Sequence, residues 1–273
     1  MEKHLELISN EDHNYLGRML TKCEFKYAKS MPEFPHWYTL RENWDSDADF
    51  IKTVMLIRKY GYKEKYWGKE YIYYNINGYK YWTMGYPLHN CPKTGTILIN
   101  KAKVVYHSEY DKIANQYDGL FINDENIIEN RQIIEMINPG DNVLDVGCGT
   151  GLFLDYYEPI EYTGIDISAN MLSVLKMKHP NRKVINVSFE DFYGNGYDTV
   201  IALFGAASYI KPQYLNRVKY LLNKGGKLFF MFYKPDYFPE TYKKMGINVK
   251  RYPVNQMNLK EFNNYLIWEY ENI

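Results

Sequence analysis

A glycine-rich turn between two apolar segments constrains the fold of this chain more than any other feature. An apolar run that contains one acid, Val143–Val146, is followed by glycines at 147, 149 and 151, and apolar residues resume at Leu152. This order predicts the first strand, loop and helix of a Rossmann-like unit, where a ligand lies beyond the carboxyl end of the strand. A dinucleotide fingerprint would place its third glycine at position 152, so Leu152 argues against a pyrophosphate ligand.

A second acid supports the same interpretation. Tyr162–Asp166 has the pattern of a second strand, and Asp166 at its end follows Asp145 by 21 residues. In Rossmann-like units, a carboxylate at the tip of the second strand accepts hydrogen bonds from both hydroxyls of a ribose. The two acids therefore favour a ligand that contains a ribose.

On these residues, the segment from about 110 to 273 resembles the class I S-adenosylmethionine (SAM)-dependent methyltransferases. Six pieces carry the resemblance, in order along the chain: 110–118, 145–151, 164–168, 189–192, 197–201 and 222–226. One glycine loop would be weak evidence, because such a turn can serve strand–helix packing alone. Six pieces at matching spacings are specific, and they imply a SAM cofactor and an enzyme that transfers a methyl group.

The resemblance also implies which residues would hold the cofactor. The backbone of Gly147, Gly149 and Gly151 would run beside the methionine moiety, with Asp145 near its amino group and Phe204 along the same side. The remaining residues would surround the adenosine or close the site: Asp166 at the ribose, Ile167 and Met171 over the adenine, Glu190 or Asp191 at the adenine amine with Phe192 nearby, and Tyr117 as the cover. The alternatives are a strand-end turn for Asp166, solvated loop acids for Glu190 and Asp191, and ordinary packing for Tyr117 and Met171.

Methyl transfer from a sulfonium needs alignment and exclusion of water more than a dedicated catalytic constellation. A general base is required only for a hydroxyl or a protonated nitrogen as the acceptor. The candidates are Tyr209, Tyr110, His107 and His36, each of which could instead make a structural hydrogen bond. Tyr209 is favoured because it lies just past the fourth strand, where substrate enters in this family.

The residues after the fourth strand also count against two chemistries. The segment 203–209 lacks the Asn/Asp-Pro-Pro-Tyr pattern of the DNA enzymes that methylate exocyclic amines. It also lacks the Pro-Cys pair that supplies the thiolate for covalent methylation at cytosine C5.

The alternation of elements from residue 142 to 233 predicts an α/β fold with a Rossmann-like, mostly parallel sheet and helices on both faces. Helices are expected over 108–117, 124–136, 151–158, 168–179, 212–223 and 235–245. Strands over 248–254 and 264–269 would close the sheet as an antiparallel C-terminal hairpin. Only nine residues, 188–196, separate the third and fourth strands, too few for the full crossover helix that the family often has there. No substrate-recognition insert is expected after the fourth or fifth strand.

The first hundred residues are expected to form a small α+β domain of their own, residues 1–100, ahead of a SAM-binding domain over 101–273. Asn77–Gly78 predicts a type I′ hairpin that pairs Tyr74 with Tyr81 on one face and Tyr73 with Trp82 on the other. A helix over 46–60 should cover one of these faces. The other aromatic face would meet the second domain, a partner or a substrate, so this domain is the expected recognition module.

Composition restricts the partners. Lys plus Arg equal Asp plus Glu at 33 each, so no net field draws the protein to nucleic acid or to a membrane. The three cysteines, Cys23, Cys91 and Cys148, have no metal-binding spacing, which favours a reduced, cytoplasmic setting and no metal site. The first residues lack the apolar core of a signal peptide, and no stretch has the length of a membrane span.

Three functional hypotheses follow. The first is in-line methyl transfer from SAM to a small-molecule or nucleotide acceptor bound between the two domains. The second is methylation of RNA or DNA, with the tyrosine-rich domain stacking exposed bases beside a local cluster of lysines: Lys59, Lys63, Lys65, Lys69 and Lys80. The third is a non-catalytic module that binds SAM or a partner. The balanced charge disfavours nucleic acid.

Overall fold

The computed structural model describes residues 7–22, 26–27, 37–39, 47–66, 69–83, 98–121, 123–254 and 258–273. The chain divides into two compact units. Unit 1 is Met1–Val105 with Asp191–Tyr193, and unit 2 is Tyr106–Glu190 with Gly194–Ile273. Among the described residues, no helix combines the length and the apolar character that crossing a bilayer requires.

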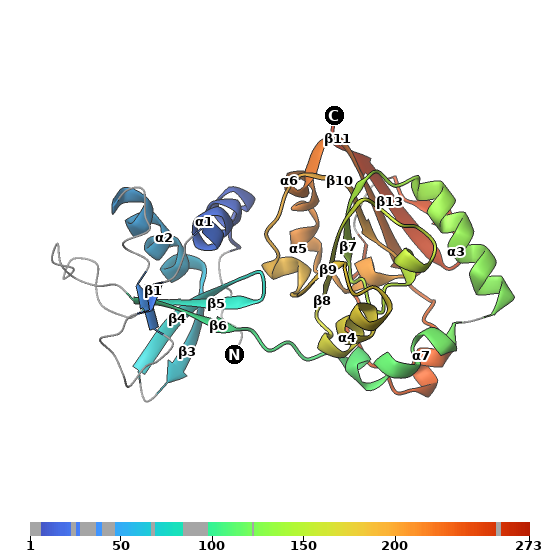
Figure 1. Ribbon diagram of the computed structural model, residues 1–273, viewed down its shortest axis with the longest axis horizontal. Helices are drawn as coiled ribbons and strands as arrows, with labels where there is room; N and C mark the ends of the chain where they lie inside the picture. The colour runs from blue at the N-terminus through green and yellow to red at the C-terminus, as the bar shows by residue number, and fades with distance from the viewer. Residues whose placement is uncertain are drawn as a thin grey trace. The chain divides into compact units, whose positions relative to one another are not determined.

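Unit 1 is an antiparallel sheet with two helices. Its described strands are β1 (Lys26–Tyr27), β2 (Trp37–Thr39), β3 (Tyr62–Tyr66), β4 (Lys69–Ile76), β5 (Tyr79–Thr83) and β6 (Leu98–Lys103), in the spatial order β1-β2-β6-β5-β4-β3. Helices α1 (Asn10–Lys22) and α2 (Asp47–Tyr60) lie on one face of this sheet (Figure 1).

The hairpin of β4 and β5 has the predicted register. Tyr74 pairs with Tyr81, and Tyr73 pairs with Trp82. Asn77 and Gly78 have φ angles of 49° and 80°, as a type I′ turn requires at both central positions. Tyr74 and Tyr81 point toward the helices, where they are buried in one apolar cluster with Leu16, Leu20, Phe50, Val54 and Ile57. As expected, α2 covers one face of the hairpin, and it is the face that carries Tyr74 and Tyr81.

A segment from far along the chain completes unit 1. The Asn77 amide donates to the carbonyl of Asp191 over 3.0 Å. The Asn77 side chain donates to the carbonyl of Tyr193 and accepts from its amide, over 3.0 and 2.7 Å. His13 Nε2 lies 3.0 Å from the carbonyl oxygen of Phe192. The hairpin turn and α1 therefore hold residues 191–193 by their backbone.

Unit 2 is the predicted Rossmann-like sheet. Its strands are β7 (Asn142–Val146), β8 (Glu161–Asp166), β9 (Lys183–Asn186), β10 (Tyr197–Ala202), β11 (Leu222–Tyr233), β12 (Lys260–Phe262) and β13 (Tyr265–Glu271), in the order β12-β13-β11-β10-β7-β8-β9. The strands β7 to β11 pair in parallel, and β13 is antiparallel to both β11 and β12. The strand order reverses between β7 and β10, which is where open α/β sheets bind ligands.

Helices cover both faces of this sheet. They are α3 (Asp124–Ile137), α4 (Ala169–Lys178), α5 (Pro212–Leu215), α6 (Val218–Leu221) and α7 (Glu240–Lys244). α3 begins where the Asn123 side chain accepts from the Asn126 amide, and ends at Asn138 in the left-handed conformation. α3 and α4 bury apolar side chains in one core cluster, whereas α5 and α6 lie on the opposite side of the sheet from α3 (Figure 1).

Several helices are shorter in the structure than predicted, and the predicted strand over 248–254 is wrong. The expected helix over 151–158 is a single 3-10 turn, η6 (Leu152–Asp155), and the expected helix over 108–117 is two such turns, η3 (Glu109–Lys112) and η4 (Ala114–Gln116). The expected strand over 248–254 is irregular. There, the Tyr252 amide donates to the Ser208 carbonyl and the Arg251 guanidinium donates to the Tyr237 carbonyl, so this segment bonds to loops. β12 takes its place in the closing hairpin.

Candidate functional site

A cavity of about 400 Å³ opens in unit 2 beyond the carboxyl ends of β7, β8 and β10. This volume suits a small organic ligand, since such sites are usually about 300–1,000 Å³. The cavity lies at the reversal of strand order, where the sequence places the ligand. It brings together nine of the predicted site residues: Tyr117, Gly147, Gly149, Asp166, Ile167, Met171, Glu190, Phe204 and Tyr209.

Two glycines of the loop after β7 have different roles. Gly147 has φ of +72°, and a Cβ atom there would lie 2.8 Å from the Cβ of Ala206. Gly147 therefore lets the loops after β7 and β10 approach each other. Gly149 has φ of +53°, but a Cβ atom there would meet no protein atom within 4 Å. The backbone at Gly149 thus faces open space in the cavity, where a ligand can approach it closely.

Asp166 is held in place by backbone donors. Its Oδ2 accepts from the Gly149 amide over 3.0 Å, and its Oδ1 accepts from the Ser168 amide over 2.7 Å. Burial raises the pKa of this carboxyl group to about 6, against the opposing effect of the two amides. At pH 7 the carboxylate is mostly ionised, and it can accept further hydrogen bonds from a ligand in the cavity.

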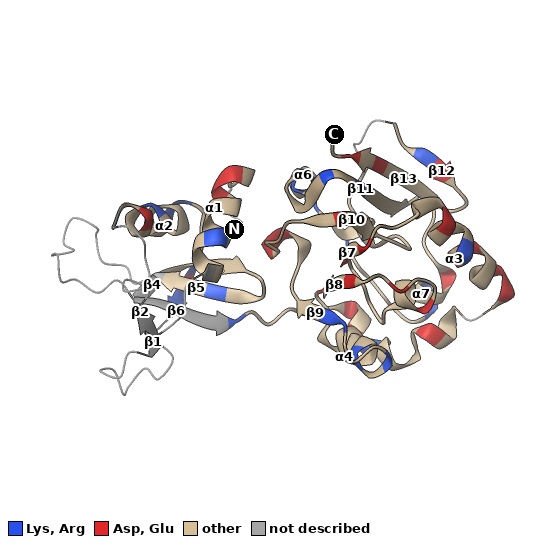
Figure 2. Cartoon of the chain, turned by 45° about the horizontal axis from the view of Figure 1, so that its top comes forward, with Lys and Arg blue, Asp and Glu red and all other residues tan. Residues whose placement is uncertain are grey.

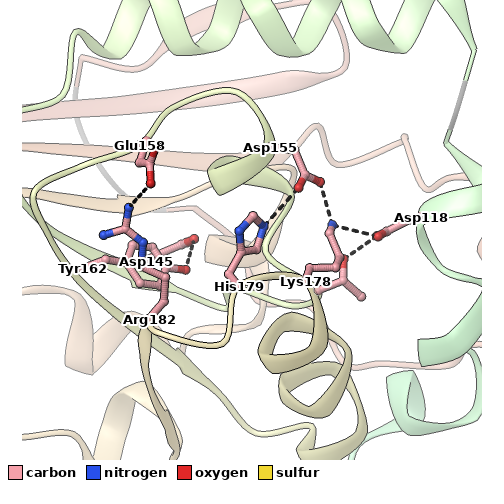
Figure 3. Close-up of polar contacts among 9 residues, drawn as sticks. Asp118, Asp145, Asp155, Glu158, Tyr162, Lys178, His179 and Arg182 are labelled. Carbon is pink, nitrogen blue, oxygen red and sulfur yellow. Dashed lines mark hydrogen bonds and ion pairs between the residues drawn. The ribbon is translucent and has the colours of Figure 1, made fainter.

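Four predicted residues are not brought to the cavity. Asp145 is only 3% exposed, and it accepts from the Tyr162 hydroxyl over 2.9 Å (Figure 3). Burial raises the pKa of Asp145 to about 7. Gly151 lies where a Cβ atom would be 2.9 Å from the Leu175 side chain, so it serves the packing of the loop on α4. Asp191 and Phe192 belong to unit 1.

Two pairs of tyrosine hydroxyls lie beside the cavity. The hydroxyls of Tyr110 and Tyr209 are 2.7 Å apart, and so are those of Tyr117 and Tyr242. Burial raises the pKa of Tyr110 and of Tyr209, so both phenols stay protonated near neutral pH. Tyr209 can therefore orient an acceptor by hydrogen bonding. Of the other candidate bases, His107 lines the cavity and His36 lies outside the described residues.

A polar network that the sequence did not reveal supports the glycine loop. The Thr150 hydroxyl, which is 1% exposed, donates to Asp118. Lys178 at the end of α4 bridges Asp118 and Asp155, with Nζ 2.9 and 2.6 Å from the two carboxylates (Figure 3). Burial alone would lower the pKa of Lys178, but the two carboxylates together raise it. The network ties the loop to α4 and to the turn at Asp118.

The turn after β10 is strained at Phe204. This residue has a backbone φ of 53°, an uncommon value for a residue other than glycine or asparagine. The next residue is Gly205, where a Cβ atom would lie 2.2 Å from the Tyr233 ring. Strain of this kind persists where the surrounding structure fixes it, often at ligand sites. Phe204, at this strained turn, lines the cavity.

The described part of the chain holds no group of three or more histidine, cysteine or acidic side chains placed to bind a metal ion. Cys148 is buried in the glycine loop, and burial raises the pKa of its thiol. A buried, protonated thiol is a poor nucleophile.

Comparison with known proteins gives the family. A family model described as a methyltransferase domain matches residues 123–269. An uncharacterized protein of Methanocaldococcus jannaschii is 35% identical over 135 residues, which are 48% of this chain and 53% of that protein. The tRNA (uracil(54)-C(5))-methyltransferase of Pyrococcus furiosus is 24% identical over 217 residues, 77% of this chain and 40% of that protein. The chain thus spans about half, or less, of the length of these relatives.

Solved structures include a SAM-bound amino pentose methyltransferase from Micromonospora echinaspora, with 21% identity, a TM-score of 0.37, and coverage of 58% of this chain and 65% of that one. The family match includes the glycine loop, Asp166 and the turn at Phe204, and extends over more than half of the chain. This chain belongs to the methyltransferase domain family, and the prediction of a class I SAM-dependent methyltransferase is confirmed.

Proposed function

We propose that the cavity of unit 2 binds SAM and that the enzyme transfers its methyl group in line to a small-molecule or nucleotide acceptor. The observation that carries this proposal is the arrangement of Gly149 and Asp166. The Gly149 amide orients the carboxylate, and the same glycine leaves open space beside its backbone. A carboxylate fixed next to an accessible backbone suits a ligand with a ribose diol and a flexible chain.

The remaining lining residues fit the other parts of SAM. Ile167 and Met171 offer apolar contact for the adenine, and Glu190 offers an acceptor for its amine. Phe204 would lie along the methionine side, and Tyr117 would close the site over the cofactor. Asp145 and Gly151 would support the glycine loop. Asp145 does so through its hydrogen bond with Tyr162, and Gly151 through its close packing on α4.

SAM supplies an activated methyl group on a sulfonium, so the protein's own task is to position the acceptor and exclude water. The ring faces of Tyr110, Tyr117 and Tyr242 pack edge-on or stacked within 6.3 Å of one another. Their hydroxyls lie 2.7 Å from neighbouring tyrosine hydroxyls, Tyr110 with Tyr209 and Tyr117 with Tyr242. Tyr209 is the residue we propose to orient the acceptor.

Calorimetric titration with SAM tests the cofactor site directly. One SAM per chain is expected, with heat lost in an Asp166→Ala variant that remains folded. An intact protein that shows no binding would overturn the proposal. Turnover of SAM in the presence of fractionated metabolite pools then identifies the acceptor.

Methylation of RNA at a pyrimidine C5 atom, which the name of the Pyrococcus relative describes, is a weaker candidate for this chain. That chemistry uses a cysteine thiolate as a covalent nucleophile. Among the described residues, Cys148 is buried with a raised pKa. Acidic and basic residues are also interspersed over the described elements (Figure 2). Retention on immobilised tRNA that falls steeply with salt would instead favour RNA.

We also propose that residues 1–100 form a recognition domain and residues 101–273 the methyltransferase domain. What supports a recognition role is an aromatic ladder on the sheet face opposite α1 and α2. The ring centroids of Tyr62 and Tyr73 are 5.4 Å apart, and those of Tyr73 and Trp82 are 4.7 Å apart. The cytoplasmic location expected from the sequence stays a prediction.

A further inference from the structure

One part of the cavity that is proposed to bind SAM is lined by residues with no expected role in holding the cofactor. This part, which we call the acceptor side, consists of Tyr110, Tyr209 and the segment 248–250. Tyr209 is the residue proposed to orient the acceptor, and it lines the same cavity as the cofactor residues. An acceptor on this side therefore shares one cavity with the methyl donor.

A backbone hydrogen bond holds the segment with Lys250 beside the loop with Tyr209. The Tyr252 amide donates to the Ser208 carbonyl over 2.9 Å. Tyr209 directly follows Ser208, and Lys250 precedes Tyr252 by two residues, which span at most about 7 Å. Both side chains line the cavity, so Lys250 and Tyr209 belong to adjoining parts of one wall.

Arg251 lies close enough to Tyr209 to act on its hydroxyl. Burial raises the pKa of the Tyr209 phenol, while the hydrogen bond with Tyr110 and the positive charge of Arg251 oppose this effect. The Arg251 guanidinium donates to the Tyr237 carbonyl over 2.5 Å and lies 5.1 Å from the centroid of the Phe238 ring. These contacts fix the guanidinium and leave its charge free to attract an anion beside Tyr209.

The two cations of this segment have no acidic partner in the part of the chain that the structure describes. Lys250 Nζ lies 5.2 Å from the centroid of the Tyr252 ring, and no carboxylate pairs with it. Arg251 contacts a carbonyl and a ring, and it likewise forms no ion pair there. Two adjacent positive charges without counter-charges are therefore present at the acceptor side.

The acids in the cavity lining do not neutralise these charges. Asp166 and Glu190 are the residues proposed to bind the ribose and the adenine amine. Glu109 also lines the cavity, but its Oε2 lies 2.5 Å from Lys112 Nζ. His107, the remaining titratable group near this side, carries no negative charge in either protonation state. The acceptor side is therefore positive, and it attracts anions and repels cations.

We propose that the methyl acceptor is a small molecule with a carboxylate or phosphate group, which Lys250 binds while Tyr209 positions the atom that receives the methyl group. This inference rests on the proposed SAM-dependent function and names its substrate class. The anionic group serves for binding and is not itself the nucleophile. An ammonium group is a compact charge with rotatable donors, so it suits either kind of anion. Lys250 is thus a specificity residue.

Benzoate, phenyl phosphate and the neutral benzamide are the probes. Each is titrated by calorimetry into the full-length protein in excess S-adenosylhomocysteine, the demethylated product, which occupies the cofactor site together with its own carboxylate. We expect the better of the two anions to bind roughly tenfold tighter than benzamide. Which anion binds more tightly distinguishes a carboxylate acceptor from a phosphate acceptor.

Two variants test the role of the lysine. Lys250→Gln should remove at least half of the logarithm of the ratio between the affinities for the better anion and for benzamide. Lys244→Gln is the matched control, because Lys244 is an exposed lysine of α7 that does not line the cavity. It should leave the ratio unchanged.

Equal or absent binding of the anions and benzamide, or an unchanged ratio in Lys250→Gln, would overturn the inference. Binding of SAM is measured on the same proteins and reports on the proposed function alone. If Lys250→Gln weakens SAM binding and keeps the anion preference, Lys250 pairs with the carboxylate of the cofactor, and the inference is wrong. Anion preference in a protein that does not bind SAM would reject the cofactor assignment and leave an anion site.

Discussion

The backbone amide of Gly149 donates a hydrogen bond of 3.0 Å to the Asp166 carboxylate. This bond joins the loop after β7 to the end of β8, across the two strands that flank the cavity. A second amide, from Ser168, fixes the other carboxylate oxygen. The orientation of Asp166 is therefore set before any ligand binds, which lowers the entropy cost of binding.

The first prediction concerns Asp166→Asn. The amide side chain is isosteric, but its NH2 group must face one of the two backbone donors, and it accepts fewer hydrogen bonds. Hydrogen bonds to a charged group contribute about 1.5–3 kcal/mol, so SAM affinity should fall roughly 10- to 100-fold in calorimetry. Asp198→Asn is the matched control, because Asp198 also accepts from a backbone amide, that of Asn142, away from the cavity. It should lower stability without changing SAM affinity.

The second prediction separates backbone strain from steric blocking at Gly149. Gly149→Ala should destabilise the fold by about 1–2 kcal/mol, because φ is +53°. It should also weaken SAM binding at least tenfold, because the new methyl group enters the cavity. Gly225→Ala carries similar strain at φ of +76° and also meets no atom within 4 Å, but it lies on β11. If both variants bind SAM as the native protein does, the ligand does not approach Gly149.

The third prediction tests Tyr209. Burial raises the pKa of its phenol, so Tyr209 donates or accepts a hydrogen bond rather than removing a proton at neutral pH. Tyr209→Phe should raise KM for the acceptor and leave the shape of the pH–rate profile between pH 6 and 9 unchanged. The exposed Tyr220→Phe should be silent. If the native pH–rate profile depends on pH at its alkaline end and the Tyr209→Phe profile does not, Tyr209 acts as a general base.

The elements that sequence patterns predicted well are those fixed by local chemistry. Asn77 and Gly78 set the hairpin register because only a primed turn fits their backbone angles. The acid at the end of β8 lies at the edge of the sheet where the cavity opens, because parallel strands end at one edge. Both signals lie within a few residues of the feature that they predict.

The elements that could not be predicted depend on contacts between distant residues. The bridge from Lys178 to Asp118 joins residues 60 positions apart, and no periodic pattern encodes it. Asp191 and Phe192 stand in a segment that matches the family's adenine site. In the fold, Asn77 and His13 instead hold the backbone of this segment in unit 1. The helix expected over 151–158 is a single 3-10 turn, Leu152–Asp155, which follows the left-handed Gly151 and ends ahead of Pro159.

The last prediction uses Asp145, whose pKa burial raises to about 7 from its usual range near 4. The folded state binds this proton more tightly than the unfolded chain does. The contribution to stability is therefore fully present below about pH 4 and is lost as pH rises through 7. Each unit of pKa difference between the folded and unfolded states corresponds to about 1.4 kcal/mol. Ionisation of Asp145 at high pH therefore lowers the free energy of unfolding by up to about 4 kcal/mol.

Asp145→Asn removes this cost, and its amide oxygen still accepts from the Tyr162 hydroxyl. The free energy of unfolding is measured in urea for both proteins at pH 5 and at pH 8. The variant's value minus the native value should increase by about 2–3 kcal/mol from pH 5 to pH 8. Other titrating groups, such as Asp166 with a pKa raised to about 6, are present in both proteins and cancel in the difference. A difference that does not change with pH would show that Asp145 titrates normally, and that its bond to Tyr162 stabilises the charged form enough to offset burial.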